Sequence, residues 1–156
     1  MTPDLRARVL AIYAEADAAV AAAGPRCDAS GRCCRFVEYG HTLFVSNLEA
    51  DVLLAAAPAY AKPVSGDVCP FQVNNLCTAR EPRPLGCRVY FCDPAYQDAG
   101  TAISETYLRR LKGLADESGT AWRYAPLHAF LNAAGERPPA ADPAAGPTRI
   151  PLTVTG

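Results

Sequence analysis

Apolar residues recur at helical spacing near the start of the chain. The stripe consists of Leu5, Val9, Ile12, Tyr13, Ala16 and Val20. This period predicts an amphipathic helix over residues 3–23. Thr2 suits its N-cap, Pro3 its first position, and the Gly-Pro pair at 24–25 its end. We expect the charged residues on its other side to face solvent, namely Arg6, Arg8, Glu15 and Asp17.

A second stripe of the same kind lies in the later half of the chain. It consists of Ile103, Tyr107, Leu111 and Leu114. The spacing predicts a helix over residues 102–117, which Gly119 ends. Glu105 and Arg109 stand four positions apart, so we expect them to form an ion pair on its surface.

Shorter elements are predicted between and after these helices. Ser46-x-x-Glu49 is a capping box and opens a helix over residues 47–57. Runs of β-branched and aromatic residues predict two short strands, or one bent strand, at 36–39 and 42–45, and a further short strand at 121–125. A helical turn is expected over residues 126–132.

Residues 58–92 contain several prolines and glycines, which exclude long regular elements. We therefore expect a small α+β fold, in which a few helices and short strands surround a loop-rich centre. The predicted domain covers residues 1–133. Residues 134–156 are rich in Ala, Pro and Gly, and we expect a flexible tail there.

Charge and composition exclude several classes of function. Fifteen basic and sixteen acidic side chains give a net charge of −1, which provides no general attraction to nucleic acid or to an anionic membrane. No phosphate-binding Gly loop, nucleophile elbow or zinc-protease motif is present. The start of the chain lacks the pattern of a secretory signal. We predict a cytoplasmic protein with no membrane span, whose aromatic residues pack in its core.

The cysteines carry the strongest chemical signal. The chain has seven, in one group made of Cys27, Cys33 and Cys34, and a second group made of Cys69, Cys77, Cys87 and Cys92. Clustered thiolates are typical ligands of zinc, copper(I) or iron–sulfur clusters. Disulfides fit less well because the count is odd and cytosolic thiols stay reduced. Buried, inert thiols are the third interpretation. We predict that all seven bind metal.

The second group has the features of a folded binding loop. Asn74-Asn75 suits a tight turn that brings Cys77 back toward Cys69, and Gly86 allows close approach of the backbone beside Cys87. Three arginines share the segment and are candidates to offset thiolate charge, namely Arg80, Arg83 and Arg88.

The order of these residues is Cys-x5-Cys-Cys, Cys-Pro-Phe, Cys and then Arg-Pro-x-x-Cys-Arg-x-Tyr-x-Cys. Over about residues 27–92 it resembles the bacterial YkgJ-type cysteine cluster family, which is described as a zinc- or iron-chelating domain. The resemblance implies metal chelation but no defined reaction. Glu49 fits the family's usual acidic position. Ser30 stands where members carry a further cysteine, which leaves three alternatives: a water, His41, an acidic side chain or Ser30 itself completes the ligand set, the metal keeps an open position, or the function is lost.

Three functions remain open at this point. The first is a metal-binding protein that holds zinc or iron. The second is an enzyme with an iron–sulfur or open zinc site that runs redox or sulfur-transfer chemistry. The third is a zinc-stabilised interaction module, which exposed apolar surface on residues 102–132 would favour. Zinc ranks first, although short Cys-x2-Cys knuckles are absent. An iron–sulfur cluster ranks second, and copper ranks third.

Overall fold

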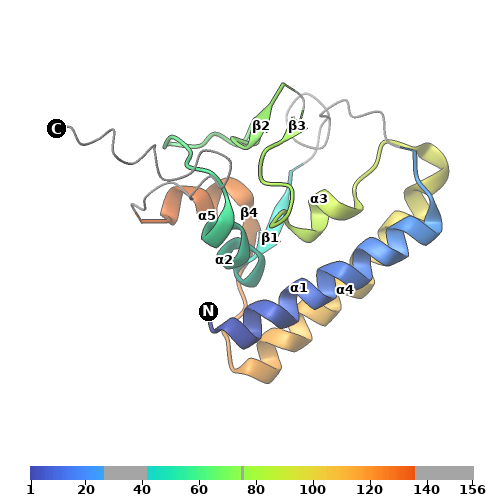
Figure 1. The fold of residues 1–156 in the computed structure, drawn as a ribbon, viewed down its shortest axis with the longest axis horizontal. Helices are drawn as coiled ribbons and strands as arrows, with labels where there is room; N and C mark the ends of the chain where they lie inside the picture. The colour runs from blue at the N-terminus through green and yellow to red at the C-terminus, as the bar shows by residue number, and fades with distance from the viewer. Residues whose placement is uncertain (27–41, 75, 136–156) are drawn as a thin grey trace, which may run out of the picture.

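Two long helices lie side by side along one edge of the molecule (Figure 1). α1 spans Pro3–Ala23 and α4 spans Gln97–Ser118. Ion pairs join Arg8 to Glu117 and Glu15 to Arg110, which shows that the two helices run antiparallel. The computed structural model describes residues 1–26, 42–74 and 76–135.

α1 confirms the first predicted helix from end to end. The hydroxyl of Thr2 accepts a 3.1 Å hydrogen bond from the backbone N–H of Leu5, and Gly24 ends the helix at a φ of 66°. A left-handed φ of this kind favours glycine, which has no Cβ to clash. The residues that α1 buries are the six of the predicted stripe.

α2 spans Asn47–Ala56 and confirms the helix predicted after the capping box. Ser46 and Glu49 bond each other's backbone N–H groups as that motif requires. Glu49 itself is buried, so this local motif also places a carboxyl group inside the fold.

One pair of strands joins distant parts of the chain. β1 (Phe44–Ser46) and β4 (Tyr124–Pro126) form an antiparallel pair in which Val45 lies opposite Ala125. β1 begins two residues after its predicted start, and β4 begins three residues after its predicted start. α5 (Leu127–Ala133) follows β4 directly and confirms the predicted helical turn. The predicted strand at 36–39 lies outside the described residues.

The loop-rich segment contains more structure than its prolines and glycines suggested. β2 (Gln72–Val73) and β3 (Leu76–Cys77) form a small hairpin, and α3 (Leu85–Val89) is a single short helix. The hairpin confirms the turn predicted at Asn74, which has a φ of 52°. α3 was not predicted, because five residues are too few for a periodic signal.

The second long helix begins earlier than predicted. α4 starts at Gln97 rather than at residue 102, after a 3₁₀ turn at Pro94–Tyr96. Its first turns have no large apolar residue and include Gly100, which reads as a helix breaker. A Cβ at Gly100 would lie 2.6 Å from Cε2 of Tyr96. Close packing against Tyr96 therefore explains the glycine at this position, although glycine has a low helix propensity.

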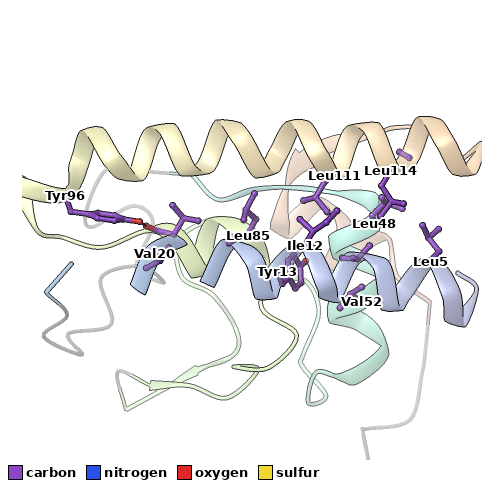
Figure 2. Close-up of a cluster of buried hydrophobic side chains, with 14 residues drawn as sticks. Leu5, Ile12, Tyr13, Val20, Leu48, Val52, Leu85, Tyr96, Leu111 and Leu114 are labelled. Atoms are coloured by element: carbon purple, nitrogen blue, oxygen red, sulfur yellow. Dashed lines mark hydrogen bonds between the residues drawn. The ribbon is translucent and has the colours of Figure 1, made fainter. Parts of the chain in front are cut away.

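Two groups of buried side chains form the core. One joins α1, α2, α3 and α4, and Figure 2 shows its side chains between the two long helices. Leu111 and Leu114 are buried in it, with Ile103 and Tyr107 partly buried against it. The other group joins β1, α2 and α5 to the loop-rich segment, and it includes Cys69.

Within the described residues, five α-helices and short antiparallel strands form one small domain, which confirms the predicted α+β class. Among the described residues, no helix combines the length and hydrophobicity that a membrane span needs. The predicted tail lies outside the described residues from position 136 onward, so its flexibility stays a prediction.

Candidate metal centre

Three of the four cysteines of the second group line the same small cavity. Cys69, Cys77 and Cys87 form part of its wall, and its volume is about 30 Å³, enough for one ion or one water molecule. Cys69 is buried, with 6% of its surface exposed, and the other two are half-buried. The rest of the described wall consists of Leu53, Phe71, Ala79, Arg83, Pro84 and Leu127.

The β2–β3 hairpin positions two of these thiols. The backbone N–H of Gln72 donates to the carbonyl of Cys69 at 3.2 Å, and Gln72 pairs with Cys77 across the hairpin. Beyond Cys77, the N–H of Thr78 donates to the carbonyl of Phe71 at 2.8 Å. Phe71 is buried beneath the hairpin. These bonds bring the two cysteines to the same wall, as the predicted turn required.

α3 positions the third thiol, and a buried carboxylate holds that helix. The N–H of Leu85, its first residue, donates to Glu49 at 2.8 Å. Gly86 packs against Leu43, and a Cβ there would lie 2.6 Å from the Leu43 Cδ1 atom. A larger residue at position 86 would require the Leu43 side chain to shift.

The three candidate arginines have different roles. Arg83 lines the thiol cavity, and its Nε is buried without a hydrogen-bond partner among the described residues. Arg88 is fully occupied elsewhere, because it pairs with Asp17 at 2.8 Å and stacks on the ring of Tyr13. Arg80 is exposed. Only Arg83 thus combines a free buried donor with a place on the cavity wall.

Arg88 holds the segment that precedes α3. Its Nε donates to the carbonyl of Arg83 at 2.9 Å, and its Nη2 donates to the carbonyl of Glu81. Asp17, its partner on α1, is exposed as predicted, and its carboxylate pairs with the buried Arg88. Nothing in the linear pattern marks this contact, because the two residues lie far apart in the chain.

Buried polar groups surround the base of α3. Burial raises the pKa of Glu49, although hydrogen bonds from Ser46 and Leu85 oppose the shift. Burial also raises the pKa of Tyr13 well above its ordinary value, and the nearby Glu49 adds to the effect. The Tyr13 hydroxyl has no hydrogen-bond partner among the described residues. The sequence placed Tyr13 in the core but gave no sign of this polar neighbourhood.

Cys92 is the one described cysteine that does not border the small cavity. It is half-buried and precedes Asp93, whose carboxylate accepts hydrogen bonds from the N–H groups of Arg26 and Ala95. These two bonds lower the pKa of Asp93, and the one from Arg26 has the larger effect.

The first group of cysteines lies outside the described residues, as do Ser30 and His41. Across the described part of the chain, no set of three or more Cys, His, Asp or Glu side chains is grouped so as to hold a metal ion. The three thiols share a wall, but the described ligand set is not closed. Cysteine sulfurs beside the unpartnered Nε of Arg83 nevertheless have the chemistry that a soft metal centre needs.

No protein-family model matches this chain, and neither a curated protein nor a solved structure does. The resemblance to the YkgJ-type family therefore rests on the motif and its spacing alone.

Proposed function

We propose that this protein binds a soft metal ion through its cysteines, with Cys69, Cys77 and Cys87 at the centre of the site. The observation that carries the proposal is the cavity that these three thiols share. Their chain segments reach it from a hairpin and from a separate helix. Inert core cysteines would not need to meet at one cavity, because a small apolar residue would fill the same space.

The charge around the cavity supports the same proposal. Thiolates around a divalent cation leave a site negatively charged, and burying that charge is costly unless a donor compensates it. Arg83 supplies an unpartnered buried Nε at the cavity wall. A buried donor without a partner is costly in itself, so we expect Arg83 to bond a sulfur ligand in the metal-bound protein.

The remaining ligands are proposed to come from Cys92 and from Cys27, Cys33 and Cys34. The described chain on either side of the first group is anchored beside the second group. Arg26 bonds Asp93, next to Cys92, and Leu43 packs on Gly86, next to Cys87. The described residues that flank the first group therefore contact the immediate neighbours of Cys92 and Cys87, which supports a shared site.

Zinc is the proposed metal, and iron or an iron–sulfur cluster is the alternative. Bound zinc supplies structural cross-linking or Lewis acidity, and an iron–sulfur cluster supplies electron transfer. In either case the protein's own residues bind the metal and limit its contact with water. Cys69, Cys77 and Cys92 are free thiols, which suits a reducing compartment, and we propose a cytoplasmic location.

The interaction-module alternative has less support. Within residues 102–132, Tyr124 is the one large apolar side chain that is clearly exposed, and it stacks on Phe44. One such residue is too small a patch to mark a protein interface.

The test is metal analysis of anaerobically purified protein, combined with its absorption spectrum. We expect about one zinc per chain and no charge-transfer band, since a closed thiolate site binds one ion. Cys77→Ser and Cys87→Ser should each lower metal content, whereas Ala79→Ser adds a hydroxyl to the same cavity without removing a thiol and should keep it. Visible sulfur-to-iron absorbance would instead show that the bound group is an iron–sulfur cluster and not zinc. Metal-free protein after anaerobic isolation and zinc reconstitution would refute the proposal.

A further inference from the structure

A surface groove runs between the two long helices, which lie at one edge of the molecule (Figure 1). Its volume is about 450 Å³. Its middle is lined by Ala11, Ile12, Gly113 and Leu114. All of its described lining comes from α1 and α4, so no other described element covers it. A Cβ at Gly113 would meet no atom within 4 Å, which leaves room for a helix of another chain to approach closely.

Four charges of alternating sign border this groove. Arg8 pairs with Glu117 at one end. Arg110 pairs with Glu15 at the other end. On each helix the two charges stand seven positions apart, which is about 10.5 Å along the helix axis. Because the helices run antiparallel, the two arginines lie at diagonal corners of the groove and the two glutamates lie at the other corners.

These ion pairs leave binding capacity for a second chain. The four side chains are 46–64% exposed, and an exposed pair contributes under about 1 kcal/mol to the free energy of folding. A guanidinium has several N–H donors, and a carboxylate accepts more than one hydrogen bond, so each group can bind a further partner. Every charged residue of the described lining already has an ion-pair partner. A small ion would therefore find no unpaired charge there.

The order of the charges is self-complementary. A two-fold axis in the plane of the groove, either along the helices or across them, places each arginine of one copy opposite a glutamate of the other. Two helix pairs packed in this way form a four-helix arrangement. We propose that the protein forms a symmetric homodimer through the α1–α4 face, with the groove at the centre of the interface. The proposal does not rest on the thiol centre.

The test is sedimentation velocity of the full-length protein, as purified with its metal, in a reductant that prevents disulfides between chains. The interface has little apolar area, so we expect a dissociation constant of about 10–100 μM. Raising NaCl from about 20 mM to about 500 mM should increase this constant about tenfold, because salt screens exposed charges. Protein that stays monomeric in low salt at about 500 μM, well above the expected constant, would overturn the proposal.

Charge-reversal variants locate the contact. Glu15→Arg combined with Glu117→Arg makes all four positions positive. Arg8→Glu combined with Arg110→Glu makes all four negative. Each variant should dimerise at least about tenfold more weakly than the wild type, because like charges then meet across the interface. An equimolar mixture of the two should form a mixed dimer, which also shows that both variants fold. A mixture that does not associate, or a dimer that persists in both variants, would contradict the proposed face.

A matched control reverses two acidic residues outside the groove. Asp51 and Glu105 are exposed and do not line it. The predicted ion pair between Glu105 and Arg109 does not form among the described residues, so the control breaks no such pair. Asp51→Arg combined with Glu105→Arg changes the net charge as much as the all-positive variant does, and it should keep the dimer. Equal loss in the control would show that net charge, and not the α1–α4 face, governs association.

Discussion

The carboxylate of Glu49 accepts a 2.8 Å hydrogen bond from the backbone N–H of Leu85. Glu49 lies in the first turn of α2, and Leu85 begins the helix that carries Cys87. The same carboxylate accepts from the N–H and the hydroxyl of Ser46 at 2.8 Å. One buried side chain therefore joins the start of α2 to the start of α3, and it sets where one wall of the thiol cavity lies.

Replacing Glu49 with alanine should destabilise the fold strongly. The change leaves the N–H groups of Ser46 and Leu85 buried without an acceptor, and we expect the free energy of unfolding to fall by about 3–5 kcal/mol. Asp51→Ala, at an exposed position of the same helix, should change it by less than about 0.5 kcal/mol. Urea denaturation measures both. Similar losses in the two variants would show that the buried bonds contribute little.

Glu49 should also make stability depend on pH. Its pKa is raised from the ordinary value of 4.5, chiefly by burial, so the folded protein holds this proton more tightly than the unfolded chain does. The stabilising contribution is complete below pH 4.5 and is lost as the pH rises through the folded-state pKa. Relative to Glu49→Gln, the wild type should therefore lose stability as the pH rises above 4.5. A difference that stays constant or increases with pH would contradict this direction.

Arg88 should matter more than its position in a loop-rich segment suggests. It is 8% exposed, pairs with Asp17 and holds two backbone carbonyls. Because Asp17 is 45% exposed, we expect Arg88→Ala to cost about 2–3 kcal/mol, less than a fully buried pair. Arg8→Ala breaks a pair in which both partners are exposed and should cost under about 1 kcal/mol. Thermal or urea unfolding of the two variants provides the comparison.

Two glycines of α4 should respond in opposite ways to alanine. At Gly100 the new Cβ would meet the ring of Tyr96 at 2.6 Å, and that ring is held by a hydrogen bond from its hydroxyl to the Val89 carbonyl. We expect Gly100→Ala to destabilise the protein by about 1–3 kcal/mol. Gly113 has open space around its Cβ position, so Gly113→Ala should stabilise it by up to about 1 kcal/mol. If both variants gained stability, the contact at Tyr96 would not be tight.

Removing bound metal should loosen the loop-rich segment first. Few regular elements hold residues 58–92, so ligand bonds are expected to supply much of its order. Chelation should lower the Tm and speed amide exchange in residues 69–92, with little change along α1 and α4. Readdition of zinc should restore both. An unchanged Tm after complete removal of metal would show that the segment is held by packing alone.

Local signals were enough to predict much of the fold. The stripe from Leu5 to Val20 and the Ser46–Glu49 box each lie within a few turns of one helix, so their geometry follows from nearby residues. The turn at Asn74 is equally local. The start of α4 was misjudged because Gly100 has its reason in a contact with Tyr96, which propensity does not describe.

By itself, then, the sequence determined α1, α2, most of α4, the hairpin turn and the clustering of thiols along the chain, because these depend on neighbouring residues and on backbone preferences. Only the tertiary structure decided that β1 pairs with β4, that Arg88 reaches Asp17 rather than a sulfur, and that Cys69, Cys77 and Cys87 share a cavity while Cys92 stands apart. Each of these joins distant segments. Such contacts form because side chains from many elements are buried together. The pattern of residues along the chain does not show which of these elements will meet.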